Sequence, residues 1–140
     1  MSDADITDKT ANTDNKGIDL GVIIRDSEAS LRFYRDTLGL DHIADVDMPA
    51  GVMHRLQWGT SLVKLNRPHQ PPAAANPPGG IATATGLRYF TLTVPDLDAM
   101  VARSEAGGYA TVIARREVRP GVVIAMVEDP DGNWVEFLQA

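Results

Sequence analysis

The feature that most constrains the fold is an internal repeat, because two segments of the 140-residue chain align when one is shifted by 70 positions. The first segment covers residues 17–34 and the second covers residues 87–102. The shift aligns Leu20 with Phe90, Val22 with Leu92, Ile24 with Val94, Asp26 with Asp96 and Ala29 with Ala99. Each copy begins as an alternating strand and reaches an aspartate that can accept hydrogen bonds from the first amides of a helix. The repeat predicts one domain made of two similar halves.

Periodicity extends the same pattern through both halves. Helices are expected over residues 27–38 and 97–107, each ended by glycine. Strands are expected over residues 42–47, 53–58 and 62–66, and again over 111–117, 122–127 and 134–139. The turn Asp129-Pro130-Asp131-Gly132 predicts that the last two strands form a hairpin. Each half is therefore predicted to be βαβββ, which makes the fold class α+β: two twisted modules forming an open barrel around a central cavity.

Composition divides the chain into four parts. Residues 1–16 are polar and predict a disordered N-terminal tail, whereas residues 17–140 are expected to form a single domain. Within it, residues 17–66 form the first module and residues 87–140 the second. The Pro- and Gly-rich segment 67–86 separates them, and we expect it to tie the halves together rather than to cover a cavity.

Charge and cysteine content exclude several classes of function. The sequence contains no cysteine, so disulfides and thiolate chemistry are ruled out. A net charge of −6 argues against a nucleic-acid partner, since phosphate binding requires a basic face. No apolar run approaches the roughly 20 residues that span a bilayer, and the N-terminus does not resemble a signal peptide. We therefore expect no membrane association and a cytoplasmic location.

Two motifs resemble a known family. The segment Asp26–Leu40, with its Phe33-Tyr34 pair and Gly39, and the segment Val127–Phe137 are similar to signatures of the vicinal oxygen chelate superfamily. That superfamily includes glyoxalase I, extradiol dioxygenases and bleomycin resistance proteins. The resemblance covers residues 17–140 and implies a glyoxalase-like fold and a homodimer.

The resemblance also implies a divalent metal, whose ligand positions fall on Asp19, Lys64, Tyr89 and Glu136. Only the two carboxylates are ready ligands, because a protonated lysine has no lone pair and a tyrosine must first lose its proton. We therefore expect no metal cofactor at these positions, with a divalent metal held by other ligands as the alternative. The histidines are His42, His54 and His69, and none is paired with another at ligand spacing in the sequence.

Strand alternation assigns neighbours to the same face as these four positions. Side chains expected to face the cavity and bind a ligand are Asp19, Arg55, Gln57, Lys64, Asn66, Thr91 and Trp134. Glu136 is the candidate general base and Tyr89 the candidate proton donor. The sequence thus favours a metal-independent isomerase or lyase acting on a small polar or aromatic carbonyl compound. The alternative is a non-catalytic small-molecule or drug-binding protein, and both remain open at this point.

Overall fold

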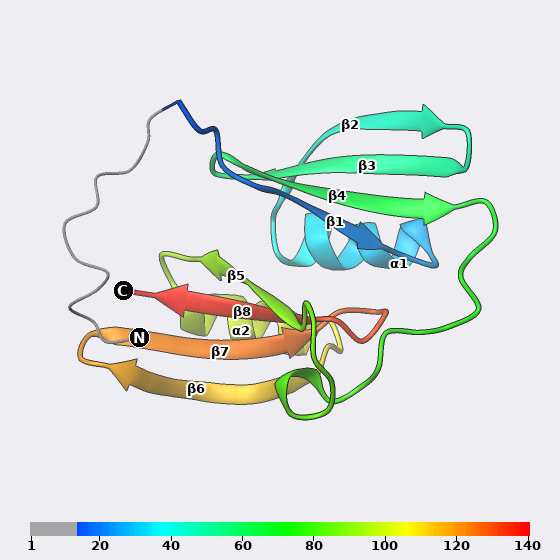
Figure 1. Cartoon of the computed structure of the whole chain (residues 1–140). Helices are drawn as coiled ribbons and strands as arrows, with labels where there is room; N and C mark the ends of the chain where they lie inside the picture. The colour runs from blue at the N-terminus through cyan, green and yellow to red at the C-terminus, as the bar shows by residue number, and fades with distance from the viewer. Residues whose placement is uncertain (1–13) are drawn as a thin grey trace.

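The structure, a computed structural model, describes residues 14–140 (Figure 1). The predicted tail therefore lies outside the described residues except for its last three positions. The first half contains β1 (Asp19–Ile23), α1 (Ser27–Leu31), a π-helix η2 (Arg32–Thr37), β2 (Asp41–Met48), β3 (Gly51–Trp58) and β4 (Ser61–Pro68). The second half contains a short 3-10 helix η3 (Gly80–Ala82), β5 (Tyr89–Thr93), α2 (Leu97–Ala106), β6 (Thr111–Arg119), β7 (Val122–Glu128) and β8 (Trp134–Gln139). The two βαβββ modules and the α+β class are confirmed.

Each half forms one four-stranded sheet, with strand orders β1-β4-β3-β2 and β5-β8-β7-β6. In both sheets the first strand pairs in parallel with the last, while the other neighbours are antiparallel. Figure 1 shows the sheets one above the other, so that the edge strands β1 and β5 face each other. Among the described residues no strand pairing joins the two sheets, so the barrel is open.

The helices begin in the same way and continue differently. Asp26 accepts a hydrogen bond from the Ala29 amide at 3.1 Å, and Asp96 accepts one from the Ala99 amide at 3.0 Å, so both predicted caps form. The first helix, expected to be regular over 27–38, widens into a π-helix after Leu31. The wider turn lets two successive aromatic rings, those of Phe33 and Tyr34, lie fully buried in contact with each other.

A single apolar core crosses from one half to the other. The ring of Phe33 meets that of Tyr109 edge to face at 4.7 Å, and Tyr34 stacks on Phe90 at 6.3 Å. Leu65 and Phe137, at equivalent places in β4 and β8, are completely buried beneath the helices. The alternation expected from the sequence is therefore present, with apolar side chains on the helix-covered face of each sheet. No helix within residues 14–140 is long and apolar enough to cross a membrane.

Candidate functional site

The site residues predicted on the first sheet lie on its face away from α1. Lys64 and Asp19 form an ion pair at 3.4 Å, with about a third and half of their side chains exposed, so the pair contributes little stability. Arg55 is the register partner of Lys64, and its Nε is buried without a hydrogen-bond partner. The other two residues bond locally, Asn66 to the Lys64 carbonyl at 3.3 Å and Gln57 to the Gly59 carbonyl at 2.8 Å.

The predicted residues on the second sheet form a separate group. Thr91 donates to Glu136 Oε1 at 2.7 Å, which orients the carboxylate on this face. Tyr89 is the register partner of Trp134, and 47% of the tyrosine is exposed. Trp134 donates from its indole nitrogen to Glu128 Oε2 at 3.1 Å. Within residues 14–140 no hydrogen bond or ion pair joins this group to the predicted residues of the first sheet.

The positions that the resemblance assigns to a metal do not fit one in this chain. The positively charged Lys64 ammonium lies beside Asp19 and would repel a metal ion bound there. The other two positions, Tyr89 and Glu136, lie on the second sheet. Within residues 14–140, the group of three His, Asp or Glu side chains whose ligand atoms converge within 4.8 Å is instead His42, Asp45 and His54. Spacing along the sequence did not indicate this group, because His42 and His54 are 12 residues apart and meet only through the pairing of β2 with β3.

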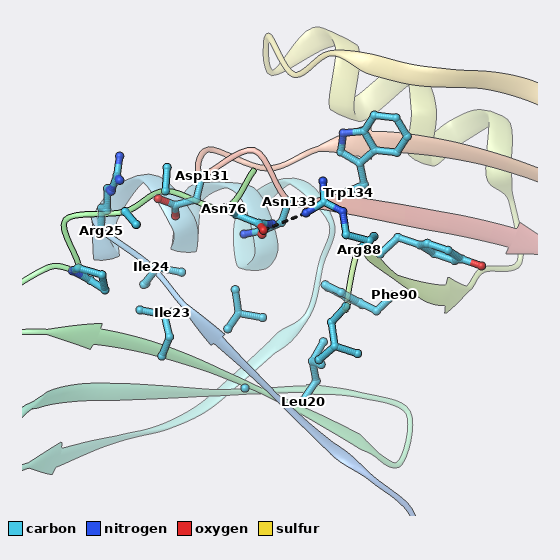
Figure 2. A pocket seen from close by; sticks show the side chains of 17 residues that line it. Leu20, Ile23, Ile24, Arg25, Asn76, Arg88, Phe90, Asp131, Asn133 and Trp134 are labelled. Atoms are coloured by element: carbon cyan, nitrogen blue, oxygen red, sulfur yellow. Dashed lines mark hydrogen bonds between the residues drawn. The ribbon is translucent and has the colours of Figure 1, made fainter. Parts of the chain in front are cut away.

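A cavity of about 290 Å³ lies between the edge strands β1 and β5 (Figure 2). Of the nine predicted site residues, Tyr89 and Trp134 line it and the other seven do not. Its walls are largely apolar and come from both halves and from the segment that links them. The lining residues are Leu20, Gly21, Val22, Ile23, Ile24, Arg25, Pro72, Ala74, Ala75, Asn76, Leu87, Arg88, Tyr89, Phe90, Asp131, Asn133 and Trp134.

The linking segment both ties the halves together and forms one wall of the cavity. Arg88 fixes it by donating to the carbonyls of Gly80 and Pro77, each at 2.7 Å, and to Asn76 Oδ1 at 3.0 Å. Gly80 packs against Trp134 so closely that a Cβ there would lie 2.2 Å from the indole ring, and its φ of +56° also favours glycine. Residues 76–80 are thus held against the second module by specific contacts.

The Asp129 turn delivers the polar side chains of the cavity. The buried Asp129 carboxylate accepts from the Tyr34 hydroxyl at 2.5 Å and from the amides of Asp131 and Asn133 at 2.9 and 2.8 Å. Burial raises the pKa of Tyr34 well above its ordinary value, and the charge of Asp129 adds to this effect. Asn76 then donates to Asn133 Oδ1 at 2.8 Å. Figure 2 shows the two labelled asparagines beside Arg88. The turn and the linking segment therefore hold each other in place.

Asp131 is the acidic group that lines the cavity, and its hydrogen bonding is incomplete. Burial raises the pKa of its carboxyl, the charge of Asp129 raises it further, and a hydrogen bond from the Arg25 backbone opposes the shift. Its Oδ2 is shielded from solvent and has no partner among the described residues. A partly desolvated carboxyl in a cavity with largely apolar walls is a feature of binding sites.

Sequence reasoning placed the Asp129 turn correctly but not its side chains in the cavity. The available signal was the Pro- and Gly-rich segment, whose length alone indicates either a functional loop or a linker. Asn76 is held near the cavity by its hydrogen bond to Asn133, and the Asp131 amide is held by Asp129 within the turn.

The fold and the cavity define a duplicated βαβββ protein with a cavity between its modules. The chain belongs to the Glyoxalase/Bleomycin resistance protein/Dioxygenase superfamily, whose sequence profile matches residues 18–137. No curated protein matches the sequence.

Several solved structures are similar. An antibiotic binding protein, TnmS3 from Streptomyces sp. CB03234, is 26% identical over 86% of this chain and 92% of its own, with a TM-score of 0.64. A glyoxalase family protein from Bacillus cereus has a TM-score of 0.76 over 92% of this chain and 98% of its own, at 17% identity. A glyoxalase family protein from Enterococcus faecalis has a TM-score of 0.68 at 21% identity, over 90% of this chain and 97% of its own. The last two show the shared fold alone.

Proposed function

We propose that this protein binds a small, flat, mainly apolar molecule in the cavity between β1 and β5, without needing a metal. The observation that carries the proposal is the combination of apolar walls with the incompletely bonded carboxyl of Asp131. The cavity is at the small end of the range for ligand pockets, which suits a molecule of one to three rings. Trp134 and Phe90 supply flat surface, and Asp131 attracts a positive charge or an N–H or O–H group of the ligand. Arg25 and Arg88 also line the cavity and attract a negatively charged group or an acceptor oxygen.

The similarity to an antibiotic binding protein supports a binding role over catalysis. Such a role requires only that the ligand be held. The side-chain amides of Asn76 and Asn133 already form hydrogen bonds with each other, with Arg88 and with Asp129. A cytoplasmic location belongs to the same proposal.

The test uses two probes of similar size and opposite charge, N-methylquinolinium and naphthalene-2-sulfonate. Trp58→Phe leaves Trp134 as the single tryptophan, so quenching of its fluorescence reports on the cavity. In that background Asp131→Asn should weaken the cation by about tenfold and should not weaken the anion. Asp47→Asn, an equal charge change on exposed β2, is the control and should leave binding of both probes unchanged. No effect of Asp131→Asn on the cation, or equal weakening of both probes, would contradict the proposal.

A metal-independent isomerase or lyase is the second candidate, and the Thr91–Glu136 hydrogen bond favours it. Glu136 would remove a proton next to a carbonyl and Tyr89 would donate one. The test is exchange of the α-protons of hydroxyacetophenone in D₂O, followed by NMR. Catalysed exchange that disappears in Glu136→Gln, and persists in Glu105→Gln, would favour an enzyme; exchange at the uncatalysed rate would remove this candidate.

The expected homodimer is also part of the proposal. Ile18 and Leu87 precede the edge strands and are 87% and 86% exposed, and Ile23 and Tyr89 are about half exposed. Three of these four line the cavity, so a second copy that covers them would also close its rim. Sedimentation velocity should show a dimer that Leu87→Glu converts to monomer, whereas Val118→Glu should leave it intact; a monomeric parent chain would contradict this.

A further inference from the structure

Three side chains outside the cavity converge on one point of the first sheet. Asp45 Oδ1 lies 2.5 Å from His42 Nε2 and 2.7 Å from His54 Nδ1, and the two imidazole rings are nearly perpendicular. One carboxylate oxygen thus lies between two ring nitrogens. His54 is buried, His42 is partly exposed, and Asp45 is exposed, so the cluster opens toward solvent on the Asp45 side.

A break in strand register brings the cluster together. In a regular strand, residues three apart such as His42 and Asp45 point to opposite faces. Here the pairing of β2 with β3 shifts between His42 and Ala44, so that His42 lies opposite Leu56 and Asp45 lies opposite His54. Since Leu56 and His54 share one face of β3, the irregularity turns His42 and Asp45 to that same face.

The face of the first sheet that carries His42, Asp45 and His54 is opposite the face that carries Asp19, Lys64 and Arg55. His54 is the register partner of the buried Leu65, whereas Arg55 is the partner of Lys64. The cluster is therefore unrelated to the metal position that the family resemblance suggested, and it is also separate from the cavity, none of whose lining residues belongs to it.

The surroundings of His54 suit a metal ligand. Its second nitrogen, Nε2, lies 2.8 Å from the Ser27 hydroxyl, which can accept the N–H and so leave the Nδ1 lone pair directed at the cluster. Histidines that bind metals almost always donate their other N–H to such a partner.

Arg35 is the feature that opposes a metal. Its Nη1 lies 3.4 Å from His42 Nδ1, and a guanidinium only donates, whereas His42 bound through Nε2 must carry its proton on Nδ1. The contact is long and Arg35 also donates to Asp36 at 2.8 and 3.2 Å. The guanidinium can therefore turn away from His42 while it stays on Asp36.

We propose that His42, Asp45 and His54 form a binding site for a divalent transition metal ion of the zinc class. Two imidazole nitrogens and one carboxylate oxygen are the donors that zinc accepts, and they discriminate against magnesium and calcium, which prefer oxygen ligands. Ligand atoms around tetrahedral zinc lie about 3.3 Å apart, so the three side chains separate slightly as the ion enters. The open side at Asp45 leaves a coordination position for water. The ion would cross-link β2 to β3 beneath the start of α1.

The test is titration of Zn²⁺ into chelator-stripped full-length protein against a chromophoric indicator, with Co²⁺ absorption as a second readout. The parent chain should bind one equivalent, and Co²⁺ should give visible bands of a four- or five-coordinate site. His42→Ala and Asp45→Asn should each weaken Zn²⁺ by at least about tenfold and remove those bands. His69→Ala, which removes a histidine outside the cluster, is the matched control and should bind like the parent.

Circular dichroism of each variant checks its folding, and His42 and Asp45 are chosen because both are partly exposed. No binding by the parent chain, or binding that His42→Ala and Asp45→Asn leave unchanged, would overturn the proposal. Arg35→Gln sharpens it, because the glutamine oxygen can accept the His42 Nδ1 proton, so affinity should rise by up to about tenfold. Unchanged affinity in that variant would overturn the assignment of Nε2 as the ligand atom.

Discussion

The two halves follow the same path yet bury different chemistry beneath their helices. The strand registers place His54 of β3 where Ala125 lies in β7, and Ser27 begins α1 as Leu97 begins α2. Leu97 and Ala125 are completely buried and apolar. At the same two positions the first half has Ser27 and His54, whose side chains are hydrogen-bonded to each other. The second half shows that the scaffold closes there without polar groups, so the polar pair is not a requirement of the fold.

The second half places its buried polar groups at the end of the sheet instead. Asp129 accepts hydrogen bonds from the turn that follows it and from Tyr34 of the other half. One half therefore has a polar cluster inside its own module, and the other has one at the junction of the modules, next to the cavity. The two halves therefore share one backbone topology and differ in where they hold buried polar groups.

The largest effect is expected from placing the first-half residue in the second half. Ala125→His would put an imidazole where Ala125 has no exposed surface and Leu97 offers no hydrogen bond. We expect a loss of about 3 kcal/mol in the free energy of unfolding, from overpacking and an unpaired buried polar group. Urea unfolding measures it. Ala125→Leu adds similar bulk without polarity, so an equal loss in both variants would show that packing alone sets the cost.

The reverse exchange should cost less. His54→Ala removes hydrogen bonds to Asp45 and Ser27 and leaves a cavity, so we expect a loss of about 2 kcal/mol in metal-free buffer. His54→Leu keeps most of the volume and imitates the apolar second half, and it should recover most of the loss. If His54→Leu unfolds as easily as His54→Ala, the hydrogen bonds themselves stabilise the fold, and the comparison between the halves is weaker than stated.

Periodic features were predictable from the sequence because they depend on neighbours along the chain. The aligned strands starting near Leu20 and Phe90 and the caps at Asp26 and Asp96 follow from alternation and local hydrogen bonding. So do the two faces of the regular strands β1, β4, β5 and β8. The π-helix was not predictable, because it depends on both Phe33 and Tyr34 finding space in a core shared by the two halves.

The two polar sites escaped the sequence for different reasons. Asp131 lies at the cavity because Asp129 shapes the turn and because residues 72–76 fold back against it, which is a tertiary effect. His42 and Asp45 are three residues apart in a strand, so alternation predicts opposite faces, and a single register shift reverses that prediction. Alternation is thus reliable for regular strands and fails at bulges.

Equal effects are expected where the halves agree. Asp26→Ala and Asp96→Ala each remove a cap hydrogen bond of nearly the same length, so each should cost about 1 kcal/mol in the free energy of unfolding. Thermal or urea unfolding of both single variants and the double variant measures this, and distant caps should add. A clearly larger cost for Asp26→Ala would mean that the π-helix makes the first helix depend more on its cap than the regular α2 does.

The smallest effect concerns Asp131 and depends on pH. Its pKa is raised on folding, mainly by burial, so the folded state holds this proton more tightly than the unfolded state. Stability associated with this group is therefore present below the ordinary aspartate pKa and is lost as pH rises through the raised folded value.

Asp131→Asn cannot lose a proton, so its free energy of unfolding at pH 7 should equal or slightly exceed that of the parent. The difference should be less than about 1 kcal/mol, because the side chain is partly exposed. The difference between the variant and the parent should shrink as pH is lowered toward 3. Urea unfolding of both proteins across this range measures it, and a variant that is less stable than the parent at pH 7 would mean that Arg25 stabilises the ionised carboxylate more than burial penalises it.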